Sequence, residues 1–419
     1  MSNIVRLYEL YTDHSFETLP EKTRNASLRV YIEGIGTTAD AGDSLYAQAT
    51  GRGETGVSAR VEQSPKKIIG QVRSLIDKNP NLLIEKIEFD IFGFSRGAAA
   101  ARHFANEVLK GERSILADAF PAGSPALSST FDWRPQSSIS INFIGLFDTV
   151  AAIANPWLFD FTGANSRNSG LDLKLPDGCA NKVVHLVARD EYRENFALNS
   201  LGDIDLFLPG AHSDLGGGYL PRAKEKLLLS NPITSTISRD KDATRSAAYV
   251  AAEKEAFAWY AKGVIEEDVP GSQLRVAFWE RAVTQSTQKG RTSPDPQKRV
   301  YAAASIERPV HGELSLVHLR IMRELAVRHE VPLDVIDPND PKLALPAELE
   351  PIYKKLEAYA LGKTAVEGLT VKERELLRAR YIHLSAHWNA AKGLNSSDMN
   401  ILFINRPAKN NRRVVHPHE

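Results

Sequence analysis

The chain has 419 residues, which is enough for one large α/β domain or two ordinary domains. Lysine plus arginine and aspartate plus glutamate number 52 each, so no net charge favours nucleic acid or an anionic membrane surface as a partner. Cys179 is the only cysteine, which excludes an intramolecular disulfide.

The amino-terminal segment and the hydrophobic profile bear on localisation. Residues 1–15 lack a basic stretch followed by an apolar core, so we expect no signal peptide. No window approaches the roughly 18 consecutive apolar residues of a membrane-spanning helix. We therefore expect a soluble protein, made in the cytoplasm, that leaves its cell, if at all, by a route other than a cleaved leader.

The first half of the chain alternates between helix and strand patterns. Apolar spacing predicts helices over residues 3–11, 64–78 and 98–109. Runs of strand length lie at residues 28–32, 87–92, 139–146, 183–188 and 203–208. This alternation continues to about residue 215 and is typical of a mostly parallel sheet flanked by helices.

The pattern changes after Tyr219. Residues 221–242 are polar and turn-like, and amphipathic helices are predicted over residues 247–264, 313–329 and 370–388. We predict a core of residues 1–220, a mainly helical lid or accessory segment of residues 221–393 packed on it, and a polar, basic, partly disordered tail of residues 394–419. The accessory helices could dock on a membrane, although such helices more often pack on a core.

Residues 87–101, IEFDIFGFSRGAAAA, combine a strand, a tight turn and an alanine-rich helix start. In that context the Gly-x-Ser-x-Gly pattern predicts the nucleophile elbow of an α/β-hydrolase-like fold, with Ser95 as the nucleophile. We expect Gly93 and Gly97 to be needed because strand and helix approach too closely for a β-carbon. The Arg96 amide would face the oxyanion. The alternative is an ordinary turn with a capping serine.

A serine nucleophile needs a base and a group that orients the base, and both must lie at the carboxyl ends of strands. Asp148 follows the strand at 139–146, and His212 follows the strand at 203–208 in a glycine-rich turn. The chain order Ser95, Asp148, His212 is that of α/β-hydrolases. Asp148 could instead cap a helix.

Other assignments stay open for the histidine. His212 and Asp214 could bind a metal, but no third ligand has a diagnostic spacing, so we expect no metal and no cofactor. His383 or His387 could serve as the base in place of His212. We expect Asp214 to organise the turn around the base.

Three further reactive side chains are weaker candidates. Asp190 and Glu191 more often belong to an exposed or salt-bridged helix start than to a catalytic site. Cys179 lies in a turn-like stretch, LPDGCAN, and competes with the better candidate Ser95.

Several segments resemble a known family. IFGFSRGAAAARHFANEV, GLFDTVA, HLVARDEYRENF and FLPGAHSDLGGGYLP resemble the Ser-Asp-His phospholipase domain of type VI secretion lipase effectors and related uncharacterised bacterial hydrolases. The similarity extends to NIVRLYEL, to YIEGIGT with GRGETGV, and more loosely to ELSLVHLRIMRELA and YIHLSAHWN. It covers most of the chain in order.

The resemblance implies a function as well as a fold. The family's nucleophile matches Ser95, its acid Asp148 and its base His212. It implies an A-type phospholipase that hydrolyses acyl esters of glycerophospholipids and serves as an antibacterial toxin in the periplasm or membrane of neighbouring cells. The partners it implies are secretion spike or tube components and an immunity protein, with membrane phospholipid as the substrate.

The sequence departs from the family pattern at its beginning. Relatives start with a strand that ends in an Asp-Gly-Thr turn, and the loop after that strand donates the second oxyanion amide in this plan. Here the chain starts at the helix NIVRLYEL, so we expect that first strand to be absent from the chain or supplied separately.

Two other functions remain compatible with the sequence. The first is a serine esterase that acts on soluble or peptidoglycan-linked esters. The second is a non-catalytic interaction module that keeps the hydrolase fold as a scaffold.

Overall fold

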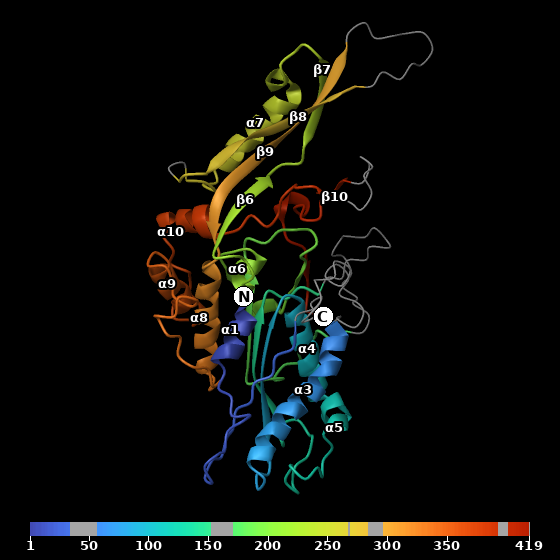
Figure 1. Ribbon diagram of the computed structural model, residues 1–419, viewed down its shortest axis with the longest axis vertical. Helices are drawn as coiled ribbons and strands as arrows, with labels where there is room; N and C mark the ends of the chain where they lie inside the picture. Colours follow the sequence, from blue (N-terminus) through green and yellow to red (C-terminus); the bar gives the residue numbers. More distant parts are fainter. Residues whose placement is uncertain (34–56, 152–170, 267–268, 284–295, 393–400, 419) are drawn as a thin grey trace, which may run out of the picture.

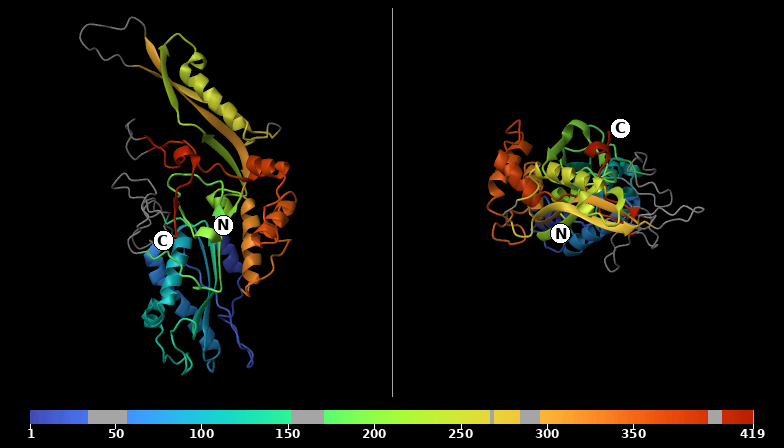
Figure 2. Two further views of the ribbon diagram at one scale, coloured as in Figure 1. Left: turned by 180° about the vertical axis from the view of Figure 1, so that it is seen from behind. Right: turned by 90° about the horizontal axis from the view of Figure 1, so that it is seen from above.

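The computed structural model describes residues 1–33, 57–151, 171–266, 269–283, 296–392 and 401–418. The molecule is elongated, with a parallel sheet and its helices at one end and an antiparallel arm at the other (Figure 1). The views from behind and from above show that the arm continues the long axis of the parallel sheet (Figure 2). No helix in the described ranges has the length and apolar character needed to cross a membrane.

The parallel sheet has the strand order β1-β2-β3-β5. Its strands are β1 (Ile87–Phe94), β2 (Ile139–Phe147), β3 (Lys182–Ala188) and β5 (Asp205–Leu208). All three pairings are parallel, so the carboxyl ends of the strands lie along one edge, which faces the arm (Figure 1). The expected mostly parallel sheet flanked by helices is therefore confirmed.

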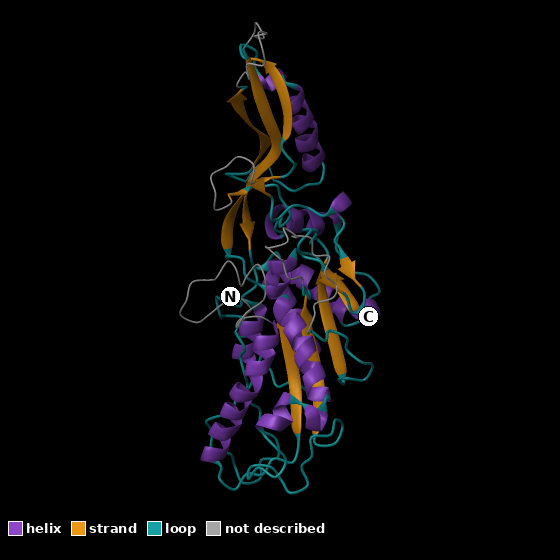
Figure 3. Cartoon of the chain, turned by 90° about the vertical axis from the view of Figure 1, so that its right-hand side faces the viewer, coloured by secondary structure: helices purple, strands orange, loops and turns teal. Residues whose placement is uncertain are grey.

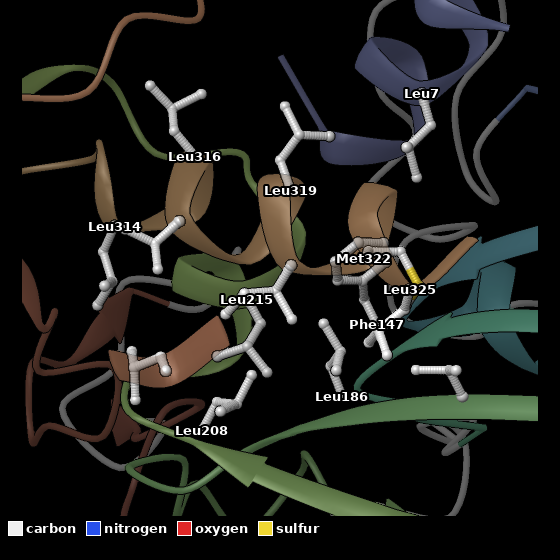
Figure 4. Close-up of a cluster of buried hydrophobic side chains, with 14 of the residues drawn as sticks. Leu7, Phe147, Leu186, Leu208, Leu215, Leu314, Leu316, Leu319, Met322 and Leu325 are labelled. Atoms are coloured by element: carbon white, nitrogen blue, oxygen red, sulfur yellow. The ribbon is translucent and has the colours of Figure 1, made fainter. Parts of the chain in front are cut away.

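One face of this sheet is covered by α1 (Asn3–Leu10) and α8 (Leu314–Val327), with α6 (His212–Gly216) and α9 (Glu350–Ala360) packed against α8. Figure 4 shows Leu215 of α6 and Met322 of α8 gathered with Phe147 and Leu186 of the sheet. Each such buried side chain stabilises the fold by about 1.5–3 kcal/mol. This cluster fixes α6 relative to the strand ends.

The opposite face of the sheet is covered by α4 (Arg96–Leu109), with α3 (Val57–Lys78) and α5 (Ile115–Ala119) packed on α4. Ala98, Ala101, Ala105 and Val108 recur at helical spacing and are buried. They form the apolar stripe of an amphipathic helix. Their small side chains let α4 lie close to the sheet, immediately after the turn that carries Ser95.

The arm is formed by the described residues between 222 and 311 and is built around one long strand. β9 (Gln297–His311) pairs with β8 (Gln273–Ala282), and it also pairs in succession with β7 (Ile233–Ser238) and β6 (Arg222–Leu228). All of these pairings are antiparallel (Figure 3). α7 (Ala247–Tyr260) packs on this sheet through Ala248 and Ala252, while its Phe257 is 75% exposed.

Short elements join the two parts. α10 (Val371–Leu376) continues into a π-helix at Leu377–Tyr381. There are also two pairs of two-residue strands: β4 (Leu198–Asn199) is parallel to β12 (Val415–His416), and β10 (Ala391–Lys392) is antiparallel to β11 (Ile401–Leu402). Single 3-10 turns lie at Gly111–Arg113, Gly202–Ile204, Ala243–Arg245 and Lys409–Asn411.

The expectation that residues 221–393 are mainly helical is wrong for the arm. Four strands, β6 to β9, lie there beside α7. The burial of β6 alternates along the strand, because one face of the arm sheet is covered and the other faces solvent. Because polar residues occupy the solvent face, the sequence of residues 221–242 was interpreted as turns. The division of the chain at residues 220 and 393 stays a prediction.

Three smaller expectations also differ from the structure. Residues 28–32 are not part of a sheet; there Arg29 donates to the carbonyls of Tyr8 and Glu9 at the end of α1. The helix expected over residues 370–388 ends at Tyr381. The tail was expected to be partly disordered; residues 394–400 lie outside the described residues, and residues 403–418 make hydrogen bonds with the core.

We predict that Asn3→Ala destabilises the protein. The buried Asn3 side chain donates from Nδ2 to the carbonyls of Leu215 (2.7 Å) and Ser315 (2.8 Å), which joins α1 to α6 and α8. Losing both donations removes two buried hydrogen bonds, each of which contributes about 0.5–1.5 kcal/mol. Urea unfolding should show this loss, whereas Glu9→Ala on the exposed side of α1 should change stability by less than about 0.5 kcal/mol. Equal stability of the two variants would contradict the prediction.

Candidate active site

Ser95 lies in the sharp turn between β1 and α4. Its φ of 58° and ψ of −126° fall in a region that L-residues rarely adopt. The turn is held by the end of β2: the Ser95 amide donates to the Phe147 carbonyl (3.0 Å), and the Ser95 carbonyl accepts from the Val150 amide (3.4 Å). The Ser95 side chain makes no capping hydrogen bond with α4. A purely capping serine is therefore not supported, and such backbone strain is typical of functional sites.

The two glycines of the turn differ in their surroundings. A β-carbon on Gly93 would lie 2.4 Å from the Gly97 carbonyl oxygen and 2.6 Å from the Ala98 Cα, so only glycine fits there. A β-carbon on Gly97 would meet no described atom within 4 Å. The close approach of strand and helix explains Gly93, and the expectation that it also requires Gly97 is wrong.

Asp148 follows β2 directly and is completely buried. Its Oδ2 accepts a hydrogen bond from His212 Nδ1 (2.5 Å), and its Oδ1 accepts one from the Ala188 amide at the end of β3 (2.9 Å). Burial alone would raise the pKa of Asp148, but the Arg413 guanidinium and the hydrogen bond from His212 hold that pKa well below its usual range. Because the carboxylate is ionised and can only accept, the proton of this pair is on Nδ1 of the imidazole.

His212 is the first residue of α6 and is 3% exposed. Its ring centroid lies 4.5 Å from that of Phe94, the residue before Ser95, and 4.9 Å from that of Phe196. Burial lowers the pKa of His212, against the opposing effect of Asp148. The imidazole is therefore neutral at pH 7, with Nε2 as the nitrogen that can accept a proton.

Arg413 completes the surroundings of Asp148 and was not found from the sequence. Its Nη1 donates to Asp148 Oδ1 (2.6 Å) and its Nη2 donates to Asp148 Oδ2 (2.8 Å). The two residues are 265 positions apart, in a tail that its polar composition marked only as basic. No local pattern could have indicated this contact.

A second buried pair holds the turn after Asp148. His185 of β3 accepts at Nε2 from the Thr149 amide (3.0 Å), and its Nδ1 lies 2.7 Å from Asp205 Oδ1. All of these groups are buried or nearly so. The pair thus fixes the backbone next to Asp148. His185 lies inside an apolar strand run, and the sequence pattern gave no indication of this role.

Asp214, like His212, belongs to α6, but it has a different partner. Its carboxylate accepts from the Ala211 amide (2.9 Å), from the His383 amide (3.0 Å) and from His383 Nδ1 (2.7 Å). The His383 ring stacks on Tyr219 at 3.5 Å. Asp214 therefore joins the start of α6 to the segment after the π-helix, and the structure does not bring His383 to Asp148.

The remaining sequence candidates have other contacts. His387 accepts from the Asn389 amide (3.2 Å). Glu191 is buried and bound to Arg193 (2.8 Å), which together with its other contacts lowers its pKa to about 2 against the effect of burial. Glu191 is thus salt-bridged but neither exposed nor in a helix.

Cys179 packs in the core, and burial raises the pKa of its thiol. Asp190 accepts from the Gly210 amide (2.8 Å).

Metal binding gains no support from the described ranges. No three His, Cys, Asp or Glu side chains are grouped there so that they could hold an ion. His212 and Asp214 each bind a different partner, Asp148 and His383.

The mostly parallel sheet, the Gly-x-Ser-x-Gly turn and the buried Asp–His pair at the strand ends define an α/β-hydrolase-like protein. Residues 124–239 match the model of the family described as type VI secretion system, phospholipase effector Tle1-like, catalytic domain. A solved structure of the Tle1 effector bound to the VgrG spike from the type VI secretion system is 31% identical, with a TM-score of 0.80 and coverage of 99% of this chain and 83% of that chain. The chain belongs to the Tle1-like family of type VI secretion phospholipase effectors.

The other comparisons add little. An uncharacterized protein from Pseudomonas aeruginosa is 19% identical, over 74% of this chain and 34% of that chain, but its TM-score of 0.32 carries no structural argument. No curated protein matches. The family resemblance seen in the sequence is confirmed. The family-model match includes Asp148 and His212, whereas Ser95 lies outside the matched residues, so its assignment depends on the geometry of the turn.

We predict that Gly93→Ala impairs the protein more than Gly97→Ala. The new methyl group at residue 93 would overlap the Gly97 carbonyl, so β1 and α4 would have to separate and displace Ser95. We expect a stability loss of about 1–3 kcal/mol and a fall in ester hydrolysis of about 100-fold. Gly97→Ala is the matched control and should keep most of its stability and activity. Similar losses in both variants would contradict this account of the turn.

Proposed function

We propose that this chain is an A-type phospholipase that cleaves acyl esters of glycerophospholipids through Ser95, His212 and Asp148. The observation that carries the proposal is the 2.5 Å hydrogen bond between Asp148 and His212, at the edge of the sheet where the strained Ser95 turn lies. Membership in a phospholipase effector family supports the substrate class.

The proton chemistry follows from the contacts of His212. Asp148 holds the proton on Nδ1, so the neutral imidazole can accept the Ser95 hydroxyl proton at Nε2. The Ser95 oxygen then attacks the acyl carbonyl, and Asp148 stabilises the imidazolium that forms. His212 returns the proton to the departing lysophospholipid oxygen. Water, deprotonated by the same imidazole, releases the fatty acid from Ser95.

The negative charge on the carbonyl oxygen needs donors that are already in place. Arg96 is the first residue of α4, so its amide lies at the positive end of the helix dipole, directly after Ser95. We assign the Arg96 amide as one oxyanion donor. One such donor contributes about 100- to 1000-fold to the rate.

The comparisons also support partners and a place of action. The related Tle1 effector was solved bound to the VgrG spike. By analogy, this chain is carried by a spike or tube component into a neighbouring bacterial cell and acts there on phospholipid in the periplasm or membrane. An immunity protein in the producer would block the enzyme.

We predict that wild-type protein releases fatty acid and lysophospholipid from phosphatidylethanolamine and phosphatidylglycerol vesicles, and that Ser95→Ala abolishes both products. The measurement is lipid mass spectrometry with different acyl chains at the two glycerol positions, which also identifies the bond that is cut. The control is a soluble short-chain ester with the same two proteins. Turnover of the soluble ester alone would favour a non-phospholipid esterase, and unchanged lipid release by Ser95→Ala would exclude the mechanism.

A further inference from the structure

We propose that Arg413 is a positioning residue for this reaction: it orients the Asp148 carboxylate toward His212 and partly neutralises its charge. The inference rests on the proposed function and assigns a further residue to the same site. Arg413 comes from the carboxy-terminal segment, residues 403–418, which the sequence marks only as a polar tail.

Arg413 and Asp148 form a bidentate salt bridge. Both guanidinium Nη atoms donate, one to each carboxylate oxygen, at 2.6 and 2.8 Å. The third donor, Nε, is bound to the Phe196 carbonyl (2.7 Å). The Arg413 side chain is 8% exposed and that of Asp148 is fully buried. A two-point contact of this kind fixes the plane of the carboxylate as well as its position.

The backbone around Arg413 is fixed to the same turn that carries Asp148. The Leu198 amide donates to the Val414 carbonyl (2.9 Å), next to Arg413 in the chain, where β4 runs beside β12. The Asn199 amide of β4 in turn donates to the Thr149 carbonyl (3.0 Å). β4 therefore connects the carboxy-terminal segment to the residue after Asp148. These backbone hydrogen bonds hold the Arg413 guanidinium and the Asp148 carboxylate in a fixed position relative to each other.

Arg413 and His212 share the Asp148 carboxylate. Oδ2 accepts from His212 Nδ1 and from Arg413 Nη2, while Oδ1 accepts from Arg413 Nη1 and the Ala188 amide. Arg413 is always charged, whereas His212 becomes charged only when it takes a proton. The permanent cation therefore makes protonation of His212 in the free enzyme less favourable and leaves more of the imidazole available as a base at mildly acidic pH.

Other charged groups around His212 have partners of their own. The loop after β3 supplies Glu191, which accepts from the His212 amide (3.3 Å) and is paired with Arg193. Within α6, Asp214 is paired with His383. Among the described residues, Arg413 is the cation paired directly with the carboxylate that holds the imidazole. Its removal should therefore act on His212 through Asp148.

The test compares Arg413→Met and Arg413→Lys with the neighbouring, exposed Arg412→Met as matched control. The measurement is the pH dependence of kcat/KM on phospholipid vesicles. Without the cation, His212 takes a proton more readily, so the acid limb of the Arg413→Met profile should move to higher pH by about one unit. Its plateau should fall about 10- to 100-fold because the carboxylate is no longer oriented.

The lysine variant separates charge from geometry. Arg413→Lys keeps the charge but loses the two-point contact, so its acid limb should stay near that of wild type while its plateau falls. Arg412→Met should match wild type in both. An Arg413→Met profile that is lower but has an unmoved acid limb would mean a merely structural role and would overturn the proposal, as would full activity of both Arg413 variants. If Arg413→Met does not fold, an undiminished plateau for Arg413→Lys is the overturning result.

A second readout does not depend on turnover. NMR titration of His212 in Ser95→Ala protein, with and without Arg413→Met, should show a higher imidazole pKa when Arg413 is removed. An unchanged titration would overturn the role of Arg413 even if lipid is hydrolysed. A shifted titration in a protein whose wild type hydrolyses no lipid would instead reject the proposed function and leave the coupling of Arg413 to His212 standing.

Discussion

The contact between Asp148 and His212 is the constraint on which the rest of the site depends. A carboxylate and an imidazole lie 2.5 Å apart there, both removed from water. Burial of a carboxylate is costly unless other groups satisfy it, and here the Ala188 amide and the Arg413 guanidinium do so. The fold therefore has to bring donors from two further places in the chain to one point.

The architecture explains how this is achieved. Parallel strands end along one edge, which places Ser95, Asp148 and the loop before His212 close together without any long-range side-chain signal. α6 carries His212 and is held by Leu215 in the core, by Asn3 of α1 and by the contact of Asp214 with His383. Each of these contacts restricts how far the imidazole can move relative to the Ser95 turn.

The residues of the candidate site that the sequence singled out are those with local signals. Gly93 and Ser95 are recognisable because a strained turn between a strand and a helix requires particular residues. Asp148 and His212 follow strand-like runs, and strand ends are where this class of fold places its reacting groups. Arg413 and His185 had no such signal, since their partners are set only by tertiary pairing of distant segments.

The strands of the arm were not predicted from the sequence, for a related reason. Its strands expose one face to solvent, so β6 mixes charged and apolar residues, a pattern that also describes a polar connection. Two predicted helices of the same half of the chain, α7 and α8, did form, and both bury apolar side chains. The sequence signal is therefore strong where burial is extensive and weak where a strand or a tail gains its structure from a single partner.

The most direct measurement of the central claim is covalent labelling with a fluorophosphonate probe, followed by mass spectrometry of the modified peptide. The account predicts modification of Ser95 in the wild-type protein and a loss of labelling of about 1000-fold or more in His212→Ala. The control His387→Ala should label like wild type, because His387 has no contact with Asp148 in the described structure. Labelling of another residue, or equal labelling of Ser95 with and without His212, would contradict the claim that these side chains act as one unit.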